Sequence, residues 1–188
     1  NDFLFQMGLF SEKRMQKYRS KVEYDGRHYV GWQRQDNGPS IQAAVEEAIL
    51  NFCGEQVEVI AAGRTDSGVH ALGMTTHFAL LNNNHDPATV RKAINFHLGS
   101  QPIKIIETEI VPDSFHARFS AIERRYLYRI LNRQSPPTLD CGRVWHVPRK
   151  LDIAGMQEAA EILIGEHDFS SFRAKDCQAA SPIQTLNM

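Results

Sequence analysis

The chain has 188 residues, of which 42% are hydrophobic and 23% are charged, and its formal net charge is −1 at pH 7. This composition is ordinary for a soluble globular protein, and the absence of any run of about 18 apolar residues excludes a membrane span. The three cysteines are widely spaced. They predict neither a disulfide framework nor a zinc site, and they favour a reducing, cytoplasmic location.

Residues 17–111 predict the order strand, helix, strand, strand, helix, strand. Ser40 and Gly54 bound the first helix, and Asp86 and Gly99 bound the second. The expected elements are strands at 18–24, 56–62, 74–80 and 103–111 and helices at 41–52 and 87–98. This order is typical of a ferredoxin-like or RRM-like unit, in which two helices cover one face of an antiparallel sheet.

A second unit is expected after Pro112. Its predicted elements are strands at 124–132 and 142–147, a helix from Asp152 to Gly165, an irregular turn at 167–172 and a strand that begins at 182. By analogy with the first unit, it lacks a final helix and at least one strand.

The predicted fold is therefore α+β, with two ferredoxin-like or RRM-like units whose mostly antiparallel sheets face a central cleft, the second unit being incomplete. Residues 1–16 are expected to be an N-terminal extension outside the core. Residues 17–112 form the first unit, and residues 113–188 form the truncated second unit.

Positive charge is concentrated in residues 118–150, where eight basic residues and two acidic residues give a net charge of +6. A basic segment on an otherwise acidic chain is one form that a phosphate-binding surface takes. The alternative is that these arginines simply alternate along exposed strand faces.

Residues 61–73 read AAGRTDSGVHALG, with glycines at 63, 68 and 73 around Arg64 and Asp66. In one interpretation Asp66 tightens a turn, since Asp and Gly are common turn residues. In the other, Asp66 is a catalytic carboxylate that the nearby guanidinium of Arg64 keeps ionised, and it acts as a nucleophile or a base. The histidines show no metal-ligand spacing, no second carboxylate lies close to Asp66 in sequence, and no Gly-x-x-x-x-Gly-Lys loop or HExxH motif is present.

Several blocks of the sequence resemble the TruA family of tRNA pseudouridine synthases. The residues that carry the resemblance are GRTDSGVHA at 63–71, YDGRHYVGWQRQ at 24–35, FHARFSA at 115–121, RRYLYRI at 124–130 and GEHDFSSFRA at 165–174. They occur in the family's order, and the resemblance extends from about residue 15 to residue 188.

The resemblance implies a role for three residues. Asp66 matches the catalytic aspartate, Arg64 matches an arginine that helps to displace the target nucleotide, and Tyr126 matches a tyrosine that stacks on the uracil. A base must leave the helical stack before its glycosidic bond is cut, and aromatic stacking then holds it. Without the resemblance, Tyr126 reads as an ordinary core tyrosine on a strand.

The implied activity is isomerisation of uridine to pseudouridine at positions 38, 39 and 40 of the tRNA anticodon stem-loop, without a cofactor or a metal. Attack on C6, attack on C1′ and removal of the C2′ proton all remain open as the role of Asp66. The implied partners are tRNA and a second copy of the chain in a homodimer. Arg118, Arg124, Arg125 and Arg129 are the candidate RNA-binding residues.

A non-catalytic RNA-binding module of the same fold is the alternative function. Met74 and Gln184 depart from the family pattern, in which Gln and Arg are common at these positions. A family segment that resembles Phe-Leu-His-His-Met-Val-Arg is missing, so we expect low activity from these 188 residues alone.

Overall fold

A computed structural model describes residues 15–81, 85–173 and 181–187. It contains two compact units, residues 1–125 and residues 126–188, and each is described here by itself. The expected N-terminal extension at residues 1–14 lies outside the described residues, as does Cys177.

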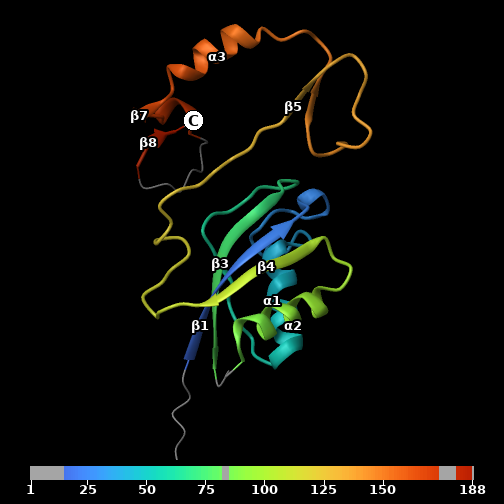
Figure 1. Cartoon of the computed structure of the whole chain (residues 1–188), viewed down its shortest axis with the longest axis vertical. Helices are drawn as coiled ribbons and strands as arrows, with labels where there is room; N and C mark the ends of the chain where they lie inside the picture. The colour runs from blue at the N-terminus through green and yellow to red at the C-terminus, as the bar shows by residue number, and fades with distance from the viewer. Residues whose placement is uncertain (1–14, 82–84, 174–180, 188) are drawn as a thin grey trace, which may run out of the picture. The chain divides into compact units, whose positions relative to one another are not determined.

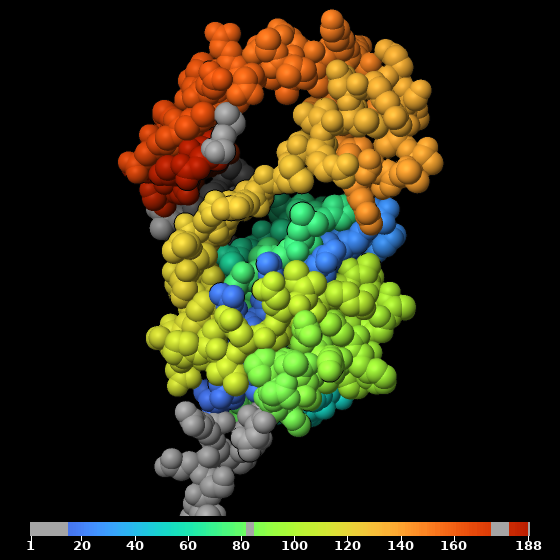
Figure 2. Space-filling view, in the orientation of Figure 1, coloured from blue at the N-terminus to red at the C-terminus, as the bar shows by residue number. Residues whose placement is uncertain are grey.

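The first unit is a four-stranded sheet with two helices on one face (Figure 1). Its elements are β1 (Met15–Tyr24), a short 3-10 helix η1 (Gly26–His28), α1 (Ile41–Cys53), β2 (Ile60–Ala61), β3 (Ala71–Leu81), α2 (Pro87–Leu98) and β4 (Ile103–Ile110). The strand order is β2-β3-β1-β4, and every neighbouring pair is antiparallel. Only patches of the central strand β1 are visible on the face shown in Figure 2.

Local capping signals determine where both helices begin. The Ser40 side chain accepts a hydrogen bond from Ala43 N at the start of α1, and Asp86 accepts from Ala88 N and Thr89 N at the start of α2. Such caps satisfy backbone donors that have no partner within the helix. Both helices therefore lie where the sequence predicts them.

The core lies between the sheet and the two helices. Its most deeply buried residues are Tyr18 and Val22 of β1, Ile49 of α1, Phe78 and Leu80 of β3, and Ile94 of α2. The rings of Tyr18 and Phe78 stack with their centroids 5.7 Å apart. Burial of these side chains is the main stabilising contribution of the unit.

The strand predicted at 56–62 is much shorter than expected, since only Ile60 and Ala61 pair with β3. A side chain replaces the ladder partner just before this point: Val59 N donates to Glu46 Oε1 at 2.9 Å. Glu46 is buried on α1, so the chain is attached to the helix there and not to the sheet.

The first unit extends to Arg125, past the boundary expected at residue 112. Lys17 Nζ donates to the carbonyls of Asp113 and Phe115, and Ala117 N donates to His77 Nδ1 at 3.1 Å. These bonds attach the segment that follows β4 to strands β1 and β3. We call residues 113–125 the strap.

The second unit contains two short strand pairs and one helix. Its elements are β5 (Ile130–Asn132), β6 (Trp145–Val147), α3 (Ile153–Glu161), β7 (Gly165–Asp168), a 3-10 helix η2 (Ser170–Phe172) and β8 (Ile183–Leu186). Strands β5 and β6 are parallel, and β7 and β8 are antiparallel. None of the described residues of 126–187 is buried.

Three predictions for the second unit were wrong in detail. Of the strand expected at 124–132 only β5 forms, because ladder pairing begins where Trp145 N donates to Arg129 O. The helix ends at Glu161 and not near Gly165. The irregular turn expected at 167–172 begins with strand residues, since Gly165–Asp168 pair with β8.

Candidate functional site

The glycine loop, residues 62–70, connects β2 to β3 in the first unit; we also call it the Asp66 loop. Its centre is a turn in which Val69 N donates to Asp66 O at 3.2 Å, with Gly68 at a φ of +79°. A positive φ at this position is readily adopted by glycine. The side chains of Arg64 and Asp66 are exposed, so both are accessible to a large substrate.

The residue between them, Thr65, is held from two directions. Trp32 N donates to Thr65 O at 3.0 Å, and Tyr24 Oη lies 2.8 Å from Thr65 Oγ1 in a hydrogen bond between hydroxyls. Burial raises the pKa of Tyr24, so the phenol stays protonated. The backbone next to Asp66 is therefore fixed by a core tyrosine and by the segment around Trp32.

Two glycines allow the loop to lie directly against the chain between β1 and α1. A Cβ on Gly31 would lie 2.5 Å from Thr65 O, and a Cβ on Gly26 would lie 2.0 Å from Val69 O. Gly31 also has a φ of +121°. Any larger residue at either position would displace the backbone around Asp66.

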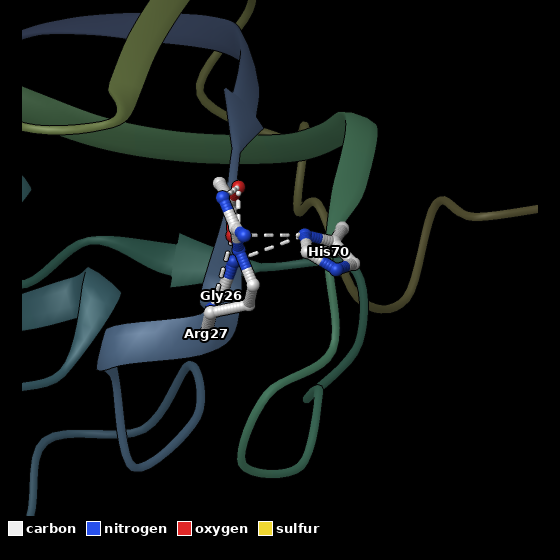
Figure 3. Close-up of polar contacts among 4 residues, drawn as sticks. Gly26, Arg27 and His70 are labelled. Carbon is white, nitrogen blue, oxygen red and sulfur yellow. Dashed lines mark hydrogen bonds and ion pairs between the residues drawn. The ribbon is translucent and has the colours of Figure 1, made fainter. Parts of the chain in front are cut away.

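The far end of the loop is attached through His70 (Figure 3). Its Nδ1 lies 3.3 Å from Gly26 N and 3.2 Å from Asp25 Oδ1. A neutral Nδ1 accepts from Gly26 N–H, and a protonated Nδ1 pairs with the carboxylate, so either state connects His70 to residues 25–26. Hydrogen bonds from Arg27 hold the pKa of Asp25 well below its usual range, which keeps this carboxylate ionised.

The segment that supports the loop is itself anchored to α1. Gln42 N donates to Trp32 O at 3.0 Å, and Arg34 N donates to the Gln42 side chain at 3.0 Å. Glu46 accepts from the Arg34 guanidinium at 2.6 Å and from the Gln42 amide at 2.9 Å. Buried polar groups are stabilising when all are satisfied, and this network secures the support beneath Thr65.

Most of these supporting residues carry no local sequence signal. Tyr24 and Thr65 are 41 positions apart, and Gln42 and Glu46 lie beside an apolar helix stripe without being part of it. The i, i+4 spacing of Gln42 and Glu46 was the one local indication of a hydrogen bond between them.

His77 of β3 connects the same sheet to the strap. It is 6% exposed, and it accepts a hydrogen bond from Ala117 N. Its ring lies 4.8 Å from that of His116 and contacts Phe115 edge-on at 6.0 Å. Burial, and then the charges of His116 and Lys17, lower the pKa of His77 from 6.5 to about 4. His77 is therefore a neutral structural acceptor at physiological pH.

The four candidate RNA-binding arginines differ in their surroundings. Arg125 pairs with Glu123 at 2.9 Å and Arg129 with Asp140 at 3.1 Å, so the two acids of the basic segment each lie against an arginine. Arg118 lies 6.0 Å from the centre of the Phe119 ring. Arg124 donates to the carbonyl of Ala62 from both Nε and Nη2.

Tyr126 is the first residue of the second unit and is 82% exposed. It lies outside any strand, so it is not the core tyrosine on a strand that its sequence position suggests without the resemblance. Arg64 and Asp66 share one loop of the first unit, whereas the place of Tyr126 next to them stays a prediction.

Among the described residues, no group of three His, Cys, Asp or Glu side chains lies close enough together to hold a metal ion. The helices of the described chain are all too short or too polar to cross a bilayer. The chemistry that the loop can supply is that of an accessible carboxylate on a fixed backbone, next to a guanidinium two residues away.

The sequence matches the family model described as tRNA pseudouridine synthase at residues 21–120 and 159–188, which include the glycine loop and the strap up to Ser120. Three similar proteins are each named tRNA pseudouridine synthase A. The one from Rhodospirillum rubrum is 59% identical over 173 residues, which are 92% of this chain and 62% of that protein. Those from Rhodospirillum centenum and Parvibaculum lavamentivorans are 55% and 49% identical over 92% of this chain and 70% of theirs.

The 188 residues thus span about two thirds of the length of these relatives. The family match covers both described units, and the identity extends over nearly the whole chain. The chain therefore belongs to the tRNA pseudouridine synthase family.

Proposed function

We propose that this protein isomerises uridine to pseudouridine in the anticodon stem-loop of tRNA, at positions 38, 39 and 40. One observation carries the proposal: an exposed carboxylate, Asp66, extends from a backbone that is hydrogen-bonded or closely packed on both sides. Catalysis requires groups whose position is set before the substrate arrives. A surface turn without such a role has no need of this many supports.

In the proposed reaction the N1–C1′ bond of uridine breaks, the uracil turns, and C5 bonds to C1′. The C5 hydrogen leaves as a proton and N1 takes up a proton, so the product is an isomer of the substrate. The reaction is an isomerisation, so no net electron transfer takes place and no redox cofactor is required. Asp66 acts as the nucleophile at C6 or C1′, or as the base that removes the C2′ proton. Arg64 occupies the gap that the displaced nucleotide leaves, and Tyr126 stacks on the uracil.

The fold and the charge distribution support an RNA substrate. The β-α-β-β-α-β order and the strand order β2-β3-β1-β4 are consistent with a ferredoxin-like first unit. Arg118, Arg125 and Arg129 are proposed to contact phosphates, the last two by exchanging their present carboxylate partners for RNA. The active assembly is proposed to be a cytoplasmic homodimer that binds tRNA.

The test is tritium release from tRNA labelled at uracil C5, because isomerisation expels that hydrogen and binding alone does not. Transcripts that carry uridine at only one of positions 38, 39 and 40 would be compared with a transcript that has none. Release from the first three and not from the fourth is expected. Tight binding of all four transcripts without release would favour a non-catalytic RNA-binding module.

A further inference from the structure

We infer that Arg124 is a positioning residue of the Asp66 loop and not a phosphate ligand. The Nε and Nη2 atoms of its guanidinium donate to the carbonyl of Ala62 at 3.2 and 2.8 Å. Arginine uses the same pair of nitrogens when it binds a phosphate through two parallel hydrogen bonds. The inference rests on the proposed function only in that the loop carries the reacting carboxylate.

The carbonyl that Arg124 binds lies at the point where the chain leaves the sheet. Ala62 N donates to Thr75 O of β3 at 2.8 Å, so the amide of Ala62 is bound by the sheet and its carbonyl by Arg124. Gly63, the next residue, lies under the guanidinium, and a Cβ there would be 3.5 Å from Arg124 Nε. Arg124 therefore fixes the peptide that connects Ala62 to Gly63.

This bond is the upstream counterpart of the bond that holds Thr65. Trp32 N binds Thr65 O on the downstream side, and Arg124 binds Ala62 O on the upstream side. Arg64 lies between these two carbonyls, and Asp66 follows immediately after the second. Loss of the Arg124 bond would free the first half of the loop while the second half stays attached.

The strap, which carries Arg124, is itself attached to the sheet. Its first part is attached to the sheet through His77 and Lys17, and Arg124 Nη2 also lies 3.5 Å from the carbonyl of Arg118 within the strap. A guanidinium on such a support loses less conformational freedom when it binds than one on a free arm.

Arg125 provides a matched control one residue away. Its side chain is 85% exposed, and it pairs with Glu123, which belongs to the same short stretch of the strap. This ion pair does not involve the Asp66 loop. Replacement of Arg125 should therefore affect RNA phosphates, whereas replacement of Arg124 should affect the loop.

The experiment compares three variants of the full-length protein: Arg124→Ala, Arg124→Lys and Arg125→Ala. Three quantities are measured for each. They are amide hydrogen exchange of peptides covering 62–70 without RNA, tritium release at saturating tRNA, and the salt dependence of tRNA binding. Arg124→Ala is expected to speed exchange in the loop and to lower the maximal rate by ~10- to 100-fold, as for a misplaced catalytic group. The slope of log binding constant against log salt should be unchanged. Arg124→Lys, which keeps the charge and one donor nitrogen but not the two-nitrogen fork, should recover part of the rate.

Arg125→Ala should show the opposite pattern: unchanged loop exchange and a salt slope smaller by ~0.7–0.9, the contribution of one phosphate contact. A smaller salt slope for Arg124→Ala with normal exchange and rate would make Arg124 a phosphate ligand and overturn the inference, as would no change in any readout. If Arg124→Ala does not fold, the same readouts on Arg124→Lys decide. If the full-length wild-type protein releases no tritium, the proposed function fails, and the exchange comparison still decides whether Arg124 holds the loop.

Discussion

Residues 15–125 bury a continuous core between a four-stranded sheet and two helices, whereas residues 126–187 form two short strand pairs and a helix with no buried residue among those described. The Asp66 loop belongs to the first of these regions and Tyr126 to the second. In the first region the backbone of the loop is held by neighbours up to 62 positions away in sequence. In the second, the elements follow local signals such as the Asp152 cap of α3.

This difference shows which part of the chain holds the backbone of the candidate site in place. The loop is held by buried or half-buried partners such as Tyr24 and Trp32, and these belong to the core of the first unit. Its geometry therefore depends on the folding of residues 15–125. Substitutions in that unit should change both stability and loop position, and comparable substitutions in the second unit should change much less.

The largest difference is expected for truncation of apolar side chains. Phe78→Ala should lower the free energy of unfolding by ~3–5 kcal/mol, because a fully buried ring leaves a cavity. Ile153→Ala on α3, where the side chain is 62% exposed, should cost ~0.5 kcal/mol or less. Urea denaturation measures both. Similar costs at the two positions would contradict the contrast between the regions.

A glycine pair tests the close contact beneath the loop. Gly31→Ala should cost ~3 kcal/mol or more, since it combines a φ of +121° with a Cβ only 2.5 Å from Thr65 O. Gly54→Ala has a φ of +75° but meets no atom within 4 Å, so it should cost only ~1 kcal/mol. Thermal unfolding and loop hydrogen exchange measure these effects. Equal costs would mean that Thr65 does not press against Gly31.

The lowered pKa of His77 predicts that the stability of the first unit depends on pH. Because its pKa is about 4 in the folded protein and near 6.5 in the unfolded chain, the unfolded chain binds more protons between these values. The contribution of neutral His77 to the free energy of unfolding is present in full above about pH 6.5. It is lost as the pH falls toward about 4, and the loss amounts to ~2–3 kcal/mol.

The control for this prediction is His77→Asn, which keeps an acceptor for Ala117 N and removes the titration. Urea denaturation of both proteins between pH 4 and 7 should give a steeper loss of stability for the wild type. Parallel curves would show that His77 does not titrate in this way.

The smallest effect is expected from the basic segment. Arg125 and Arg129 already have carboxylate partners, so RNA must replace those pairs. The double change to Ala should reduce the salt slope of tRNA binding by at most ~1.4–1.8, which is ~0.7–0.9 for each phosphate contact. Titrations between low and moderate salt measure the slope. An unchanged slope would place the RNA on another surface.

The parts of the fold that the sequence predicted correctly rest on local chemistry. Ser40, Gly54 and Asp86 mark the helix ends through caps, alternation marks β1, and β4 lies where a strand was expected. Alternation failed at residues 124–129, because a strand also needs a partner and the ladder starts only at Ile130. The strand predicted at 56–62 was too long, because the Val59 amide donates its hydrogen bond to the side chain of Glu46 on α1 and not to a neighbouring strand.

The sequence indicated candidates for the centre of the site but not its supports. It singled out Arg64 and Asp66 because glycines surround them, and their roles stay predictions. The hydroxyl pair of Tyr24 and Thr65 and the Arg124 fork depend on segments that meet only in the folded chain, so no spacing reveals them. Arg124 shows the limit most clearly, since its place in a basic run suggested phosphate binding and its contacts indicate support of the loop.

The most direct test of the central claim is tritium release from C5-labelled tRNA by the full-length wild type and by Asp66→Asn, with tRNA affinity measured in parallel. The amide has nearly the shape of the carboxylate but is neither a nucleophile nor a base, so the account predicts release by the wild type and a loss of ~10³-fold or more in the variant. Affinity and the melting temperature should be nearly unchanged, because Asp66 is exposed and its side chain bears none of the contacts that hold the loop. Release by Asp66→Asn at the wild-type rate would remove Asp66 from the mechanism and contradict the account.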